Sequence, residues 1–382
     1  MRSEQPGNGH SAAANGHASG ESRGARKPVP RLVAWEITRQ CHLDCRHCRA
    51  AASNGPYEDE LTVSEIRRVM DNIDTLSKPI VILTGGDPLR RDDVFDIVRY
   101  GADRGFRMVM SPCGKRLTET TANRLLEAGI QRISISLDGA TARSHDAFRR
   151  VSGAFTEALR GLEAARSAGL PYQINTTVTR ANVAELPELL DLAVRSGAVA
   201  FSPFLLVPTG RGKELAEQAI PAETYEQVLN WIYEVRDRVP IQVRPTCAPH
   251  FYRILRTRER EAGRAVTPES HGLDAMTRGC LGGHGFAFIS HVGKVQICGF
   301  LEKECGDLRE ESYDFVRIWE DSPVFKAVRD RSGCSGRCAA CEYWSVCGGC
   351  RARAYAATGD YLGEEPCCTY VPAAIRKGTS RG

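Results

Sequence analysis

The chain has 382 residues, which is enough for one large domain and a smaller one. Its hydrophobic content of 42% and charged content of 26% are typical of a globular protein. Basic and acidic residues nearly balance, and the formal net charge of +4 is too small to suggest nucleic-acid binding. No apolar stretch approaches the roughly 20 residues that cross a membrane, and no signal sequence is recognisable, so we expect a cytoplasmic protein with no membrane span.

Alternating strand and helix patterns dominate the first half of the chain. Residues 1–28 are rich in Gly, Ser, Ala, Asn and His, which predicts a disordered extension. The expected strands are 33–38, 79–84, 107–111, 132–137, 172–178 and 198–206. Helical patterns separate them, and Thr62 with Glu65 forms a capping box before the first helix. Six strands, each followed by a helix, predict an α/β fold with a parallel sheet wound in the right-handed sense.

Three cysteines follow the first expected strand, in the sequence CHLDCRHC. Cys41, Cys45 and Cys48 supply three thiolates, whereas a four-iron cluster with cysteine at every iron needs four. If these three hold such a cluster, one iron stays open for a small molecule. The alternatives are a zinc site, because C-x2-C pairs are common zinc elements, or three unrelated buried thiols.

Two further strand ends carry candidate binding residues. Gly85, Gly86 and Asp87 follow the second strand, where glycines let backbone groups approach a ligand closely; alone, the segment is an ordinary turn. Ser136 and Asp138 follow the fourth strand, at the expected inner face of a barrel. The alternative for Asp138 is a turn that caps a helix.

The second half of the chain contains most of the fifteen cysteines. A helix with a buried stripe is expected from Tyr225 to Val235, followed by a charged linker around 256–261 (RTRERE). A hairpin is expected from the strands 286–289 and 294–297. The clustered cysteines of a cytoplasmic chain indicate metal clusters rather than disulfides. They include Cys280, Cys298, Cys305, Cys334, Cys338, Cys341, Cys347, Cys350, Cys367 and Cys368. A zinc ribbon is the alternative.

These motifs together resemble the radical S-adenosylmethionine (SAM) enzymes with a SPASM/Twitch-type C-terminal region. The resemblance implies a partial (βα)6 TIM-like barrel and a small cysteine-rich auxiliary iron–sulfur domain. It also implies that the open iron binds SAM and that the GGDP segment contacts the SAM amino group, although relatives have Glu in place of Asp87. By the same resemblance, Ser136 and Asp138 are expected to make polar contacts to SAM. The implied organisation is an extension at 1–28, a barrel at 29–240, a linker at 241–270, an auxiliary domain at 271–372 and a tail at 373–382.

The same resemblance implies a ligand set for the auxiliary [4Fe–4S] clusters. By position, Cys338, Cys341, Cys347 and Cys368 hold one cluster. Cys280, Cys298 and Cys350 belong to a second cluster or to a site that stays empty, and Cys305 or Cys334 could complete it. Cys367 competes with Cys368, which the spacing favours.

Several long segments, among them KPIVILTGGDPL and CGGCRARAYAATGDYLGEEPCC, are similar to the anaerobic heme b synthases. The similarity implies a radical oxidative decarboxylase that converts two propionates of iron-coproporphyrin III to vinyl groups, with a flavodoxin or ferredoxin-type electron donor. Candidate propionate and haem-iron ligands are Arg211, Lys213, Arg244, Arg253, His250, His284 and His291. The alternatives are a sister enzyme that removes other side chains in the siroheme-derived route, a SPASM peptide or cofactor maturase, and a non-catalytic iron–sulfur protein.

Overall fold

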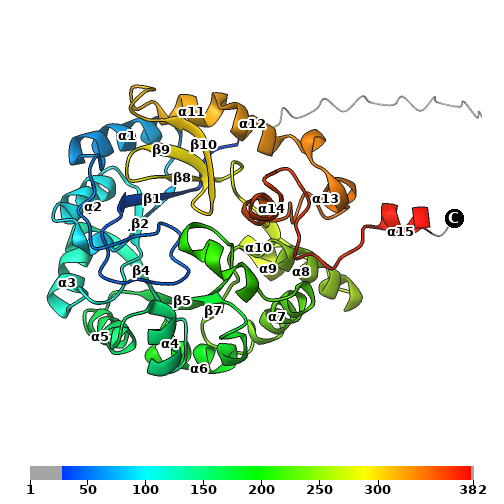
Figure 1. Ribbon diagram of the computed structural model, residues 1–382, viewed down its shortest axis with the longest axis horizontal. Helices are drawn as coiled ribbons and strands as arrows, with labels where there is room; N and C mark the ends of the chain where they lie inside the picture. Colours follow the sequence, from blue (N-terminus) through cyan, green and yellow to red (C-terminus); the bar gives the residue numbers. More distant parts are fainter. Residues whose placement is uncertain (1–27, 380–382) are drawn as a thin grey trace, which may run out of the picture.

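The computed structural model describes residues 28–379, so the predicted disordered extension lies, except for residue 28, outside the described residues. Parallel strands form the centre of the molecule and helices surround them (Figure 1). The strands of this barrel are β1 Leu32–Thr38, β2 Ile80–Gly85, β3 Arg107–Met110, β4 Ile130–Ser136, β5 Tyr172–Val178, β6 Ala200–Leu205 and β7 Gln242–Val243. Each pairs in parallel with its neighbours in this order, which confirms the expected α/β partial barrel.

Amphipathic helices cover the outside of the barrel. They are α1 Val63–Leu76, α2 Val94–Asp103, α3 Glu119–Ala128, α4 Ala142–Arg149, α5 Ala154–Ser167, α6 Leu186–Ser196 and α7 Ala222–Val235. The capping box before α1 is confirmed, since the Thr62 hydroxyl accepts from the Glu65 amide and the Glu65 carboxylate accepts from the Thr62 amide. The buried face of α1 (Ile66, Val69, Met70, Ile73) packs into the main core, as its helical spacing predicts.

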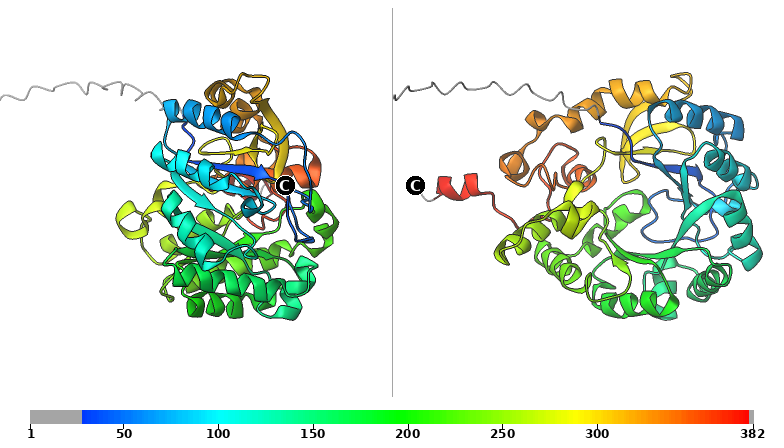
Figure 2. Two further views of the ribbon diagram at one scale, coloured as in Figure 1. Left: turned by 90° about the vertical axis from the view of Figure 1, so that its left-hand side faces the viewer. Right: turned by 180° about the vertical axis from the view of Figure 1, so that it is seen from behind.

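The sheet does not end at the barrel. The predicted hairpin is present as β8 Phe286–Ile289 and β9 Lys294–Cys298, and β10 Leu301–Asp307 extends it. Strand β8 pairs in parallel with β1, so the order of the ten-stranded sheet is β10-β9-β8-β1-β2-β3-β4-β5-β6-β7. The strands of the expected auxiliary domain therefore continue the barrel sheet and lie beside its first strand (Figure 2).

The remaining helices belong to the C-terminal half. They are α8 His250–Glu261, α9 Pro268–His271, α10 Leu273–Met276, α11 Phe315–Asp321, α12 Pro323–Arg329, α13 Gly336–Ala340, α14 Arg351–Thr358 and α15 Ala373–Thr379. Helix α15 lies within the expected tail and points away from the body of the molecule (Figure 1).

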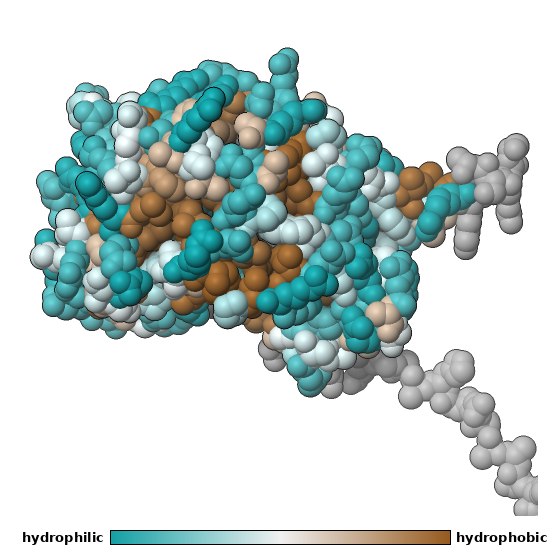
Figure 3. Space-filling model, turned by 90° about the horizontal axis from the view of Figure 1, so that it is seen from below, coloured by the Kyte–Doolittle hydropathy of each residue, from teal (hydrophilic) through white to brown (hydrophobic). Residues whose placement is uncertain are grey.

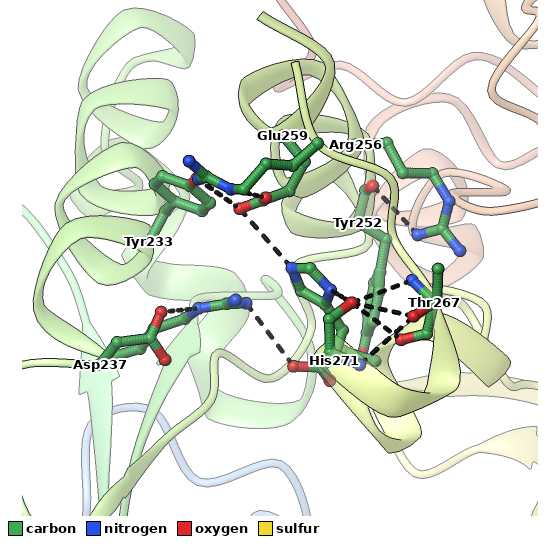
Figure 4. A network of polar contacts seen from close by, with 11 residues as sticks. Tyr233, Asp237, Tyr252, Arg256, Glu259, Thr267 and His271 are labelled. Atoms are coloured by element: carbon green, nitrogen blue, oxygen red, sulfur yellow. Dashed lines mark hydrogen bonds and ion pairs between the residues drawn. The ribbon is translucent and has the colours of Figure 1, made fainter. Parts of the chain in front are cut away.

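The expectation of a charged linker at 256–261 is wrong, because this stretch is the second half of helix α8. Apolar residues Phe251, Ile254 and Leu255 bury one side of the helix, and the charges of RTRERE lie mostly on the others. The buried Glu259 carboxylate accepts hydrogen bonds from the Tyr233 hydroxyl and the Arg264 guanidinium, and it also contacts His271 (Figure 4). This network ties α8 and α9 to α7.

Among residues 28–379, no helix is long and apolar enough to cross a membrane. Figure 3 shows one face on which hydrophilic residues surround smaller hydrophobic patches. Such a mixture is normal on a globular protein. The exposed large hydrophobic residues of the described chain are few: Val29, Val199, Leu273, Met276 and Val371.

Candidate functional site

The three-cysteine run forms a loop at the carboxyl end of β1, the end of α/β barrels where chemistry takes place. Each sulfur accepts one hydrogen bond from the surrounding protein. The Leu43 amide donates to Cys41 at 3.4 Å, the Arg149 guanidinium to Cys45 at 3.3 Å, and the Ala52 amide to Cys48 at 3.3 Å. Donors arranged in this way stabilise thiolates, the form in which cysteine binds metal.

Burial determines the protonation of these thiols. It raises the pKa of Cys41 to about 12 and also raises the pKa of Cys45, although the nearby Arg149 guanidinium opposes the second shift. Both are therefore thiols at neutral pH in the protein alone, and binding a metal cluster would release their protons.

Asp138 is a buried anchor for the loop rather than a simple turn residue. Its carboxylate accepts from the Thr177 amide at 2.7 Å and pairs with Arg149 at 2.5 Å. Burial would raise the pKa of Asp138, but the Arg149 guanidinium and the His47 imidazole lower it overall. Arg149 in turn donates to Cys45. The pair thus brings a fixed positive charge to one of the three sulfurs.

Replacing Arg149 with methionine is expected to destabilise the protein by about 3–5 kcal/mol, because it leaves the Asp138 carboxylate buried and unpaired. The measurement is the urea concentration at half-unfolding of the reduced, metal-free protein. The matched control is Arg150→Met, since Arg150 is the next residue but is partly exposed and should contribute less than about 1 kcal/mol. The double variant Asp138→Asn/Arg149→Met should recover part of the loss, and equal midpoints for Arg149→Met and Arg150→Met would contradict this account.

Gly85 and Gly86 pack directly against the backbone that leads into the cysteine loop. A Cβ on Gly85 would lie 1.9 Å from the Thr38 carbonyl oxygen, and one on Gly86 would lie 2.3 Å from the Gln40 carbonyl oxygen. The Gly86 amide donates to Thr38 and the Asp87 amide donates to Gln40. Only glycine allows this approach, and because the two amide hydrogens are already used, the backbone groups left for a ligand here are carbonyl oxygens.

A buried carboxylate faces the cysteine loop from the end of β2. Asp87 is completely buried, and it accepts from the Leu89 amide and the Cys113 thiol, with His42 at 4.0 Å. The ligand atoms of His42, Asp87 and Cys113 all lie within 4.8 Å of one another. Within the described residues Asp87 has no Lys or Arg partner, and a buried carboxylate normally requires a cation. This is therefore a place where a positively charged group of a ligand would be stabilised.

Ser136 lies at the end of β4, opposite Asn175 on β5, and is partly exposed. In the part of the chain that the structure describes, its hydroxyl makes no hydrogen bond that would prevent contact with a ligand. The neighbouring Ser134 instead bonds to Ser111 at 2.6 Å.

The loop after β6 closes over the cysteine loop. The Arg211 guanidinium donates to the carbonyl oxygens of Cys45 at 3.0 Å and Ala52 at 2.7 Å, and its amide donates to Cys48. Gly210 approaches the same backbone, because a Cβ there would lie 2.1 Å from the Arg49 carbonyl oxygen. Arg211 therefore positions the loop, and its remaining amino group lies 3.5 Å from the Asp44 carboxylate.

The first C-terminal group of cysteines lines one small cavity. Its members are Cys338, Cys341, Cys347 and Cys368. The Gly349 amide donates to Cys347 at 3.4 Å, and the Glu365 amide donates to Cys338 at 3.5 Å. The four cysteines that the sequence pattern suggested as one ligand set are thus brought together, with amide donors aimed at their sulfurs.

Cys247 lies near the second group of C-terminal cysteines, although the sequence did not suggest it as a neighbour of that group. Burial raises the pKa of Cys247 well above its ordinary value, and the neighbouring thiols of Cys350, Cys298 and Cys280 raise it further. Cys247 has a left-handed backbone conformation (φ 55°), and its carbonyl accepts from Arg353 at 2.7 Å and from Tyr225 at 3.0 Å. Because it lies 33 residues before Cys280, only the fold could reveal this neighbour.

The remaining cysteines that could have completed this group lie elsewhere. Cys305 is part of the hydrophobic core, with its sulfur facing the Lys303 carbonyl. Cys334 lies near Cys338 and Arg351, and Cys367 lies beside Arg353 and Glu365.

The cysteine sulfurs are not gathered at the spacing of a tetrahedral zinc site. Tetrahedral zinc with Zn–S bonds of 2.3 Å holds its sulfurs about 3.8 Å apart. Among the residues that the structure describes, no three cysteine sulfurs lie within 4.8 Å of one another.

Comparison with known proteins decides the family. Residues 35–193 match the radical SAM superfamily. The AdoMet-dependent heme synthase of Nitratidesulfovibrio vulgaris is 50% identical over 345 residues, which cover 90% of this chain and 94% of that protein. The chain belongs to this family of radical SAM enzymes. The Fe-coproporphyrin III synthase of Methanosarcina barkeri is only 29% identical, over 90% of this chain and 88% of its own length.

The fold of this radical SAM chain is also found among solved structures. SuiB of Streptococcus suis, in its structure bound to S-adenosylmethionine, has a TM-score of 0.69 over 90% of this chain and 78% of SuiB, at 15% sequence identity. That likeness shows the fold alone. It agrees with the barrel and the cysteine-rich C-terminal region described above.

The residues of this chain suit the binding of an iron–sulfur cluster and of SAM. Three buried or half-buried sulfurs with one donor each suit a cluster, and the cation-free carboxylate of Asp87 suits the ammonium group of SAM. The predicted haem-iron ligands are less suitable. His291 pairs with Glu36 at 2.9 Å, His284 is bonded to Arg278, and His250 is 1% exposed, so none presents a free ring to a porphyrin.

Proposed function

We propose that this protein converts two propionates of iron-coproporphyrin III to vinyl groups, which yields heme b. The observation that carries the proposal is the 50% identity to an AdoMet-dependent heme synthase over nearly the whole of both chains. The identity to the Fe-coproporphyrin III synthase, at 29%, favours this activity over that of the sister enzyme. We further infer a cytoplasmic location and a flavodoxin or ferredoxin-type electron donor.

Residues of the cysteine loop and of the end of β2 would hold the proposed cofactors. Cys41, Cys45 and Cys48 would hold a [4Fe–4S] cluster, and Asp87 with the carbonyl oxygens of Gly85 and Gly86 would bind the SAM ammonium group. When bound, the cluster and SAM supply a 5'-deoxyadenosyl radical able to remove a hydrogen atom from a propionate. The Asp138–Arg149 pair and Arg211 keep the cysteine loop fixed while this happens.

Two auxiliary clusters would occupy the C-terminal sites. Cys338, Cys341, Cys347 and Cys368 would hold one of them, and Cys247, Cys280, Cys298 and Cys350 the other. In this proposal Cys247 is the fourth ligand of the second cluster, a role for which the sequence suggested Cys305 or Cys334. The cluster at either site would be available to take the electron that each decarboxylation releases.

One lysine is suited to a substrate propionate. Of the four cations in the segments most similar to the family, Arg211 is bonded to backbone, Arg244 to Asp274 and Arg253 to Glu226. Lys213 lies in the loop that covers the cysteines and has no ion pair with any residue that the structure describes. We infer that it binds a propionate carboxylate.

The decisive experiment is an anaerobic assay of the reconstituted protein with SAM, a strong reductant and iron-coproporphyrin III, followed by mass spectrometry. Heme b together with 5'-deoxyadenosine is the expected result. Deoxyadenosine with an unchanged porphyrin would redirect the search to the sister substrates or to a peptide. A fully loaded protein that forms no deoxyadenosine would favour a non-catalytic iron–sulfur protein.

A further inference from the structure

A buried histidine with no hydrogen-bond partner faces the cavity formed by the first group of C-terminal cysteines. His250 is 1% exposed, and neither of its ring nitrogens has a partner among the described residues. It lines the same cavity as Cys338, Cys341, Cys347 and Cys368. Leaving a buried polar group unpaired costs about 1–3 kcal/mol, so a native protein normally provides it with a partner.

The surroundings of His250 identify what kind of group it would face. Its ring packs edge-on against Tyr225, with centroids 5.0 Å apart, and this contact restricts its orientation. Burial lowers the pKa of His250 to about 4, so the imidazole is neutral at physiological pH and carries one N–H donor. A group bound among the four cysteines that accepts hydrogen bonds would be matched by this ring.

A second donor lies on the same side of helix α8. Arg253 is three residues further along, is 5% exposed and lines the same cavity, and its Nε atom also lacks a partner among the described residues. The sulfur atoms of a cluster accept hydrogen bonds from such N–H groups. Helix α8, part of which the sequence suggested to be a charged linker, thus contributes two donors without partners among the described residues to the lining of the cavity that contains the four cysteines.

We propose that His250 donates a hydrogen bond to the [4Fe–4S] cluster held by Cys338, Cys341, Cys347 and Cys368, and thereby raises the reduction potential of that cluster. A hydrogen bond to a cluster stabilises the reduced form, which carries one more negative charge. The inference rests on the proposed function only for the presence of this cluster. Each conversion of a propionate to a vinyl group releases CO2, one hydrogen atom and one electron, and a raised potential favours transfer of that electron to the cluster.

The test is a potentiometric titration of the auxiliary clusters, followed by electron paramagnetic resonance. It is made in the Cys41→Ala/Cys45→Ala/Cys48→Ala background, so that the cluster at the first loop does not contribute. Adding His250→Phe is expected to lower the equilibrium constant for reduction of one cluster about tenfold, which corresponds to about 59 mV for one electron. His250→Gln should preserve part of the potential, since a carboxamide also carries N–H donors.

His271→Phe is the matched control, because His271 is also largely buried but lies in the α8–α9 network around Glu259. It should leave both potentials unchanged. An unchanged potential in His250→Phe, at full iron content, would overturn the proposal. Loss of iron from His250→Gln would overturn it too, because it would make His250 a ligand rather than a donor. The proposal would also be overturned if the native protein held no cluster at these four cysteines. Failure to form heme b would contradict the proposed function but not this proposal.

Discussion

Removal of all three loop thiols in the variant Cys41→Ala/Cys45→Ala/Cys48→Ala is expected to abolish the cleavage of SAM. The backbone of Gly86 and Asp87 is hydrogen-bonded to the strand end that leads into the cysteine loop, so the three sulfurs are the ligands that would hold iron beside the SAM site. The measurement is the amount of 5'-deoxyadenosine formed under reducing, anaerobic conditions. We expect it to fall below detection, while the auxiliary clusters still contribute iron and absorbance.

The matched control for this variant is Cys305→Ala. Cys305 is a buried cysteine of the hydrophobic core that belongs to none of the three groups, so its replacement tests the effect of losing a thiol without losing a ligand. The control should retain cleavage of SAM, with some loss of stability from the small cavity. Cleavage that persisted in the clean triple variant would contradict the assignment of the radical SAM site.

The barrel could be predicted from the sequence because its signals are local. Each strand is a short apolar run and each helix has a 3.6-residue pattern, so periodicity alone gave six strands to within about two residues at either end. The hairpin at 286–298 was found for the same reason. The place of β8 beside β1 was not predicted, since pairing between strands about 250 residues apart leaves no local pattern.

The residues missed at the site are those whose role depends on contacts distant in sequence. Arg149 reaches Cys45 across 104 positions, and Arg211 reaches it across 166. Neither arginine belongs to a recognisable sequence motif. From the sequence alone, an arginine in an amphipathic helix or a loop is predicted to be a solvent-exposed charge. Helix α8 was missed for a related reason. Its last six residues are charged or polar and resemble a linker, and the helix is recognisable only when the buried residues that precede them are included.

Cys247→Ala is expected to remove or damage one auxiliary cluster. This variant tests the assignment of Cys247 as a ligand, which the structure suggested and the sequence did not. Its thiol is close enough to those of Cys280, Cys298 and Cys350 for their charges to affect its pKa, whereas Cys305 belongs to the hydrophobic core. Iron should fall by about four per chain if the cluster is lost, or by about one if it survives as a three-iron form. The measurement is iron content with electron paramagnetic resonance of the reduced protein.

The control variants for Cys247 are the two cysteines that the sequence offered instead. Cys305→Ala and Cys334→Ala should each retain the full iron content, because Cys305 is part of the hydrophobic core and Cys334 lies beside Cys338 and Arg351. Loss of iron from Cys334→Ala with retention in Cys247→Ala would reverse the assignment. The Cys247 carbonyl is bonded to Arg353, and the Arg353 guanidinium is bonded to Glu365, whose amide donates to Cys338. These bonds connect the two groups of cysteines. If Cys247→Ala alters the signal of one cluster and leaves the other unchanged, the two groups hold separate clusters.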